Sequence, residues 1–209
     1  MYYYLPSCKV KILFPDISHK IQTYLKNKGV IILGCCKHID IKLYEDDVVI
    51  NNCTSCAIII NEKYPFLKQI SLYEYLLLQN DYKWPIYSDT KYVIQDCFKA
   101  RNNASMKNAV RLCLQKMEIE IIELSNGIDF DGTFKHKQIP SDALKAAPKF
   151  YSKYQKHIEL LNDKEIAIRM SEYINKLPLK NVVVYCNSCY KGLKMADDSC
   201  KHILELLFQ

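Results

Sequence analysis

Short apolar runs alternate with amphipathic stretches along the whole chain. Each run has the length of a buried strand and is followed by polar or cysteine-rich residues. An alternation of strands and helices is typical of parallel sheets that are covered by helices. The strands predicted in this way lie at residues 2–8, 30–34, 47–52, 91–97, 118–124 and 181–186.

Helices are expected between these strands, where apolar residues recur at helical spacing. The clearest helix spans residues 16–29: Asp16 or Ser18 suits its first turn, and Gly29 suits its end. A helix is also expected directly after Cys56. The other predicted helices lie at residues 71–80, 104–117, around 141–156 and around 162–176.

The second part of the chain repeats the order of elements found in the first. Between them, residues 81–90 (DYKWPIYSDT) interrupt the periodicity with Pro85 and polar side chains. The fold class predicted is therefore α/β, with two tandem similar units, each a small parallel sheet covered by helices. The first unit is expected to span residues 1–88 and the second residues 89–209.

Composition and charge describe an ordinary globular protein. Of the 209 residues, 49% are hydrophobic and 25% are charged, which is enough to bury a core. The net charge of +6 comes from scattered lysines without the pattern of a known nucleic-acid-binding module, so nucleic acid is not expected as a partner. The first residues lack a signal-peptide pattern, and no apolar run approaches the roughly 20 residues of a membrane helix. We expect a cytoplasmic protein without a membrane span.

The ten cysteines carry the strongest chemical signal. In a reducing compartment they are not expected to form disulfides, so metal ligation or thiol chemistry is favoured. Most of them directly follow predicted strands, and ligands of parallel α/β sheets gather beyond the carboxyl ends of the strands. The thiols of the first unit should therefore converge. They are Cys8, Cys35, Cys36, Cys53 and Cys56.

Four interpretations of the cysteines remain open from the residues alone. Free cysteine is often a small buried hydrophobe, which suits Cys113 and Cys200. Structural zinc prefers four thiolate or imidazole ligands. The first unit offers five thiols plus His38, including an adjacent pair that rarely serves one tetrahedral ion. The second unit offers three thiols and would need a fourth ligand. The residues concerned are Cys97, Cys186 and Cys189, with His136, Cys200 or His202 as the fourth.

An iron–sulfur cluster is the third interpretation, because several irons give adjacent thiolates separate partners. A thioredoxin-like dithiol is the fourth. It would use one Cys-x-x-Cys pair and leave the other three cysteines of the first unit without a role.

The ordered cysteines resemble a known family. Cys8, the Cys35-Cys36 pair and the Cys53-x-x-Cys56 pair are similar to the cysteine-rich CCG domain, and the tandem arrangement resembles the CCG-domain subunit of heterodisulfide reductase. The segments "YYYLPSCKVK", "NNCTSCAIIINEKY", "QISLYEYLLL" and "VVVYCNSCYKGL" extend this resemblance over essentially the whole chain.

The resemblance implies a noncubane [4Fe-4S] cluster held by Cys8, Cys35, Cys36, Cys53 and Cys56. In the second unit it matches Cys97, Cys186 and Cys189. This second repeat is degenerate, because Asn126-Gly127 stand where the cysteine pair is expected, in a stretch with Asp129, Asp131 and Gly132 that predicts a turn. Its site is expected to be empty, to hold zinc or to hold another cluster. The first repeat also departs from the family: only 16 residues (37–52) separate Cys36 from Cys53, and Lys37 replaces the usual glycine.

The function expected from the resemblance is electron transfer to a disulfide or another small oxidised substrate. The enzyme class stays open. Electrons would come from a ferredoxin-like iron–sulfur subunit or a flavoprotein, because the chain has no Gly-rich phosphate loop of its own. His38 and Lys37 are the candidates for a catalytic role, as proton donor and as charge stabiliser. The alternative is a non-catalytic structural or assembly subunit with zinc or a vestigial metal site.

Overall fold

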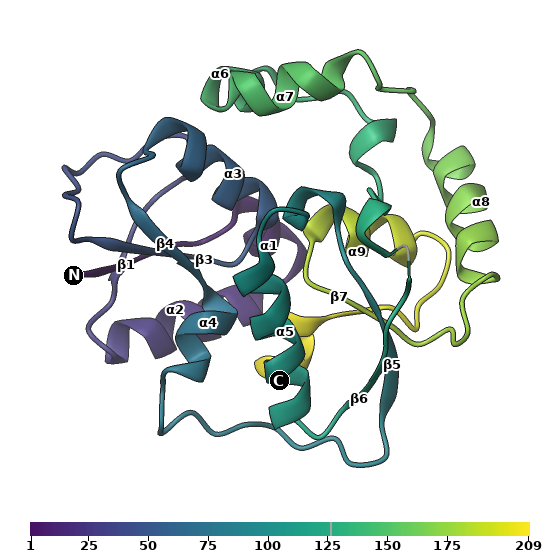
Figure 1. Cartoon of the computed structure of the whole chain (residues 1–209), viewed down its shortest axis with the longest axis horizontal. Coiled ribbons are helices and arrows are strands. Elements are labelled where there is room, and N and C mark those ends of the chain that lie inside the picture. Colours follow the sequence, from purple (N-terminus) through teal and green to yellow (C-terminus); the bar gives the residue numbers. More distant parts are fainter. Residues whose placement is uncertain (126) are drawn as a thin grey trace.

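The computed structural model describes residues 1–125 and 127–209 and contains two four-stranded sheets, both entirely parallel (Figure 1). The strand orders are β2-β1-β3-β4 and β6-β5-β7-β8, so each sheet repeats the same topology. This confirms the predicted fold class. The strands are β1 Tyr2–Leu5, β2 Ile31–Ile32, β3 Val48–Asn51, β4 Lys68–Ser71, β5 Lys91–Gln95, β6 Glu120–Ile122, β7 Val182–Val184 and β8 Lys201–His202.

Helices cover both sheets. Their order along the chain keeps the alternation with strands that the sequence predicts. The α-helices are α1 Cys8–Leu13, α2 Pro15–Asn27, α3 Thr54–Lys63, α4 Leu72–Leu77, α5 Ala104–Lys116, α6 Ser141–Ala146, α7 Pro148–Gln155, α8 Asp163–Ile174, α9 Asn187–Lys194 and α10 Ile203–Leu207. In the described part of the chain, the short 3₁₀ helices are η1 Phe98–Ala100, η2 Gly127–Asp129 and η3 Phe134–His136.

Three local features differ from the sequence-based expectation. The edge strands β4 and β8 were not expected; each is short, and in β4 only Ser71 is buried. The first strand ends at Leu5, and Cys8 begins a helix because the Ser7 hydroxyl accepts from the Val10 amide at 3.4 Å. The expected helix 141–156 is broken into α6 and α7 at Ala147, directly before Pro148.

The two sheets share one continuous hydrophobic core. A single buried cluster includes Tyr4 and Ile50 of the first sheet together with Val183 of the second. The last residues of the chain also reach the first half, where the Tyr24 and Phe208 rings lie 6.4 Å apart. The two units are therefore packed against each other as one body, and the boundary at residues 88 and 89 stays a prediction.

Helices α6 and α7 belong to the second half of the chain but pack on the first half. In Figure 1 they lie beside α3, and residues of α3 contact α6 directly. A second hydrophobic cluster joins Ala143 and Tyr151 of this arm with Leu5, Cys36 and Cys53 of the first half. The arm therefore covers the end of the first sheet where the cysteines gather.

Among the residues that the structure describes, we find no helix that combines the length and the apolar character needed to cross a membrane.

Candidate metal and thiol site

The two Cys-x-Ser-Cys segments have the same position in the two sheets. Cys53 follows β3 and is the N-cap of α3, and Cys186 follows β7 and is the N-cap of α9. The free amide groups and the positive end of the dipole at a helix N-terminus favour a thiolate over a thiol. Each segment therefore places one cysteine where negative charge is stabilised.

The five cysteines of the first unit line one cavity. It encloses about 450 Å³. The Cys8 thiol approaches the Cys35 sulfur at 3.7 Å, and the Cys56 thiol hydrogen-bonds both Cys36 and Cys53. The structure thus brings together side chains from three separate segments of the chain, which the sequence places at the ends of different strands. Whether they ligate a cluster stays a prediction.

Hydrogen bonding between these thiols separates their pKa values. The Cys56 thiol donates to Cys53 and to Cys36, which holds the pKa of Cys53 well below its ordinary value and lowers the pKa of Cys36. For the donor itself, these bonds and burial raise the pKa of Cys56. Burial and the hydrogen bond to Cys35 raise the pKa of Cys8. Two of the five sulfurs are therefore predisposed to bind a cation as thiolates.

Lysines surround the thiols. Lys99 is buried, and its ammonium donates to Ser55 Oγ at 3.2 Å and to Ser188 Oγ at 3.1 Å, the serines of the two Cys-x-Ser-Cys segments. Burial opposes its charge, but the nearby sulfurs of Cys186 and other cysteines raise the pKa of Lys99 overall. The cavity is also lined by Lys9, Lys37, Lys137 and Lys191.

Part of the cavity wall comes from the second half of the chain. Phe134, Ala143 and Tyr151 line the cavity, and Lys37 forms a salt bridge with Asp142 of α6. Of the two candidate catalytic residues, Lys37 lies on the cavity wall. His38 is exposed and lies outside the residues that line it; its backbone amide donates to the Cys35 carbonyl at 2.9 Å. The position of His38 therefore favours a turn residue over a proton donor.

The three cysteines of the second unit form a tighter group. The sulfur atoms of Cys97, Cys186 and Cys189 all lie within 4.8 Å of one another, and all three residues are buried. Sulfurs around one zinc ion are about 3.8 Å apart, given a Zn–S bond of about 2.3 Å and tetrahedral geometry. This group could therefore hold a single metal ion. Among the described His, Cys, Asp and Glu residues, it is the only group of three or more whose ligand atoms lie this close together.

Charge at the second group follows the pattern of the first. Hydrogen bonds from Cys189 and Cys97 hold the pKa of Cys186 well below its ordinary value, and the Thr54 hydroxyl lies 3.4 Å from the same sulfur. Burial raises the pKa of both Cys97 and Cys189. Of the three thiols, Cys186 is therefore the one most predisposed to be a thiolate.

The expected fourth ligands do not join this group. His202 uses Nδ1 to accept from the Leu204 amide at 3.3 Å, and burial lowers its pKa to about 4, so the ring is neutral. Cys200 is buried, with its pKa raised to about 12 mainly by burial. Neither residue, nor His136, belongs to the three-thiol group within the described part of the chain.

The second site is closed by backbone. Gly132 has φ +57°, and a Cβ there would lie 2.3 Å from the Ser188 carbonyl oxygen. The next amide, of Thr133, donates to that oxygen at 3.1 Å. Of the pair expected to replace the missing cysteines, Asn126 lies outside the described residues, and the Gly127 carbonyl accepts from Gln95 Nε2 at 2.6 Å.

Sequence reasoning missed the shared polar contacts between the two units. Lys9 and Lys99 both stand four residues after the last residue of the central strand, β1 or β5, and both ammonium groups approach Ser188, Lys9 at 3.5 Å. The serine repeated in both Cys-x-Ser-Cys segments was the signal that could have revealed Ser55 and Ser188.

Cys113 is buried in α5 near the Tyr73 carbonyl, as expected of a hydrophobic cysteine.

Together these features define an α/β protein of two tandem parallel units with a thiol-lined cavity and a buried three-thiol group. Comparisons of the chain with protein-family models, with curated proteins and with solved structures found no match. The resemblance to the CCG domain therefore depends on the cysteine order and the segments around it.

Proposed function

We propose that this chain is an iron–sulfur redox protein, resembling the CCG-domain subunit of heterodisulfide reductase, that transfers electrons to a disulfide or another small oxidised substrate. The observation that supports this most is the convergence of five cysteines on one cavity of about 450 Å³. A small substrate needs a cavity beside the thiols, whereas a purely structural metal site does not.

The donor set fits a cluster better than one ion. Five thiols that include an adjacent pair exceed the four positions of a tetrahedral ion. Unlike the sulfur atoms of Cys97, Cys186 and Cys189, these five sulfur atoms do not all lie within 4.8 Å of one another. A centre of several irons would offer positions for all five thiolates, which a single tetrahedral ion does not. When bound, such a cluster supplies single electrons at a potential tuned by nearby charge and hydrogen bonds.

The residues of the chain would bind and orient the substrate. Reduction of a disulfide breaks the S–S bond, consumes two electrons and yields two thiolates, which take up two protons to become thiols. The ammonium groups of Lys9, Lys37, Lys137 and Lys191 line the cavity and would stabilise this negative charge. They also favour a substrate that carries carboxylate, sulfonate or phosphate groups. The electrons would come from a ferredoxin-like iron–sulfur subunit or a flavoprotein.

Anaerobic purification tests this proposal. A brown protein with about four irons per chain is expected, because one [4Fe-4S] cluster requires that number. Cys35→Ser and Cys36→Ser should each bleach the visible absorption, whereas Cys113→Ser, a buried cysteine away from the cavity, should leave it unchanged. A colourless wild-type protein after anaerobic reconstitution with iron and sulfide would contradict the proposal.

The buried group of Cys97, Cys186 and Cys189 favours a second candidate, a zinc-bound structural or assembly subunit. Three sulfurs within 4.8 Å suit three of the four positions of one tetrahedral ion. In that case the protein would be colourless and contain about one zinc per chain. Cys186→Ser would release the zinc and lower stability, whereas Cys36→Ser would leave the zinc bound.

A further inference from the structure

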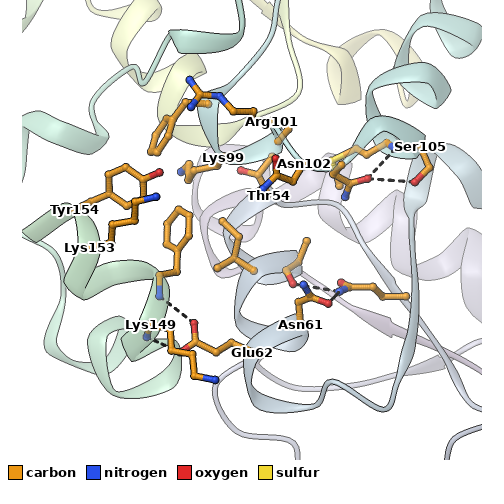
Figure 2. Close-up of a pocket in the computed structure, with 18 of the residues that line it drawn as sticks. Thr54, Asn61, Glu62, Lys99, Arg101, Asn102, Ser105, Lys149, Lys153 and Tyr154 are labelled. Atoms are coloured by element: carbon orange, nitrogen blue, oxygen red, sulfur yellow. Dashed lines mark hydrogen bonds between the residues drawn. The ribbon is translucent and has the colours of Figure 1, made fainter.

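A second and larger cavity lies between α3, η1 and α7. It encloses about 790 Å³, within the size range of small-molecule sites (Figure 2). Lys99 lines both this space and the thiol cavity. No cysteine among the described residues lines it, so a ligand here would not depend on metal ligation.

The wall of this second cavity carries an excess of positive charge. Lys99, Arg101, Lys149 and Lys153 line it, against one carboxylate, Glu62. That carboxylate is engaged at the start of α7, where it accepts from the backbone amides of Lys149 at 2.6 Å and of Phe150 at 3.1 Å. The cavity therefore favours an anion.

Two of these cations are free to bind a ligand. Arg101 is paired with Asp129. In contrast, neither Lys149 nor Lys153 takes part in a salt bridge among the residues that the structure describes. They stand four positions apart in α7, so their side chains project from the same face of the helix. Their two positive charges on the wall suit a ligand with several charged oxygens, such as a phosphate chain.

Aromatic rings form one continuous part of the same wall. The ring of Phe98 lies 6.4 Å from that of Phe150 and 5.2 Å from that of Tyr154, and the last two rings are 5.0 Å apart. Figure 2 shows Tyr154 and Lys153 on one side of the cavity, with Asn102 and Asn61 across from them. A flat ring could stack on the aromatic side while the amides hydrogen-bond its polar edge.

From this geometry we infer that the second cavity binds a phosphorylated aromatic compound of nucleotide size. Its ring packs on Phe98, Phe150 and Tyr154, and its phosphates contact Lys149 and Lys153. The volume leaves room for both parts of such a ligand, which a cavity built for inorganic phosphate would not need. Side-chain cations take the place of the glycine-rich loop that the sequence lacks.

Titration calorimetry of the full-length protein tests this inference with four probes. ADP and FMN carry both a ring and phosphate, pyrophosphate carries only the charge, and adenosine only the ring. We expect ADP or FMN to bind at least about tenfold more tightly than pyrophosphate and adenosine, a difference of about 1.4 kcal/mol. Which of the two binds better identifies the ring that the wall prefers.

Matched variants locate the binding. The double variant Lys149→Met/Lys153→Met should weaken the preferred nucleotide about tenfold or more, by the same conversion. Lys156→Met, an exposed change at the end of the same helix, should leave it unchanged. Tyr154→Leu should weaken the nucleotide and leave pyrophosphate binding as it was. Far-UV circular dichroism checks that each variant is folded.

Three results would overturn the inference. The first is that neither ADP nor FMN gives a heat of binding. The second is that pyrophosphate binds as tightly as the nucleotides, and the third is that the wild type and the double lysine variant bind the nucleotide equally well. The second would identify the wall as a simple charged surface. Since the site contains no cysteine, loss of the cluster in Cys36→Ser should not change nucleotide affinity, so failure of the redox proposal and failure of this one can be told apart.

Discussion

The two cysteine sites begin from the same local design and end in different surroundings. In both, a Cys-x-Ser-Cys segment follows a buried parallel strand and begins a helix. In the first unit the thiols face a cavity and Cys8 is exposed, whereas in the second all three are buried. The segment that follows the second strand of each sheet accounts for much of the difference. After β2 it contributes Cys35 and Cys36.

After β6 the chain instead brings Gly132 onto the backbone of Ser188 and Cys189. It then continues into the arm of α6 and α7, which covers the cysteines of the first unit. The segment after β6 thus carries no cysteine pair, and the second unit contributes a wall to the cavity of the first. This comparison indicates one accessible site and one closed site, linked by Lys99.

The largest effect is expected from Gly132→Ala. A Cβ at this position meets the Ser188 carbonyl oxygen at 2.3 Å, and φ of +57° adds strain, so we expect a loss of about 3 kcal/mol or more of unfolding free energy. Gly29→Ala is the matched control, because Gly29 also has a positive φ, +74°, but nothing lies within 4 Å of the added atom. It should cost about 1 kcal/mol. Equal losses in urea denaturation would show that the backbone does not close the second site.

Accessibility of the thiols should differ by about 100-fold between the two sites. In metal-free protein, iodoacetamide should modify Cys8 under native conditions, while Cys97 and Cys189 react only when the structure opens. Because burial and the Cys35 contact raise the pKa of Cys8, its labelling should accelerate as the pH rises above the ordinary thiol value. Mass spectrometry of timed samples measures each rate. Similar rates at Cys8 and Cys189 would remove the distinction between open and closed sites.

Lys99→Met should raise the pKa of one thiol in each unit, Cys53 in the first and Cys186 in the second. The charge of Lys99 is one cause of the lowered pKa of Cys53 and of Cys186, after their hydrogen bonds from neighbouring thiols. Removing it should shift thiolate formation at both residues to higher pH in metal-free protein. The pH-dependent ultraviolet absorbance of the thiolates, compared with that of Cys53→Ser and Cys186→Ser variants, measures the shift at each residue. Lys99→Arg, which keeps the charge, should reverse part of the shift. A shift at Cys53 alone would contradict the shared role.

The smallest effect is expected from Asp142→Asn. Its salt bridge with Lys37 joins the arm to the first unit, but the Asp142 side chain is 54% exposed. Exposed ion pairs contribute about 0–1 kcal/mol, so the loss of unfolding free energy should fall in that range. Asp163→Asn, which breaks the similarly exposed pair with Lys137, is the control. A loss well above that of the control would mean that this contact, and not the apolar packing of Ala143 and Tyr151, holds the arm in place.

Sequence patterns predicted the sheets well because parallel strands are buried apolar runs. The edge strands β4 and β8 escaped because they lack such runs: β4 reads KQIS and β8 reads KH. Within the site, the cysteines could be found from their spacing at strand ends. The roles of Lys99 and Tyr151 could not, because each acts in the other unit: Lys99 reaches Ser55, and Tyr151 covers the first cavity. Contacts between residues far apart in the chain leave no periodic signal.

The most direct measurement is an anomalous difference map at the iron edge, from crystals grown without oxygen. We predict a strong iron peak in the cavity between Cys8, the Cys35-Cys36 pair, Cys53 and Cys56, and none between Cys97, Cys186 and Cys189. An iron peak confined to the three-thiol group, or no iron peak in a protein that was reconstituted with iron and sulfide, would contradict the account.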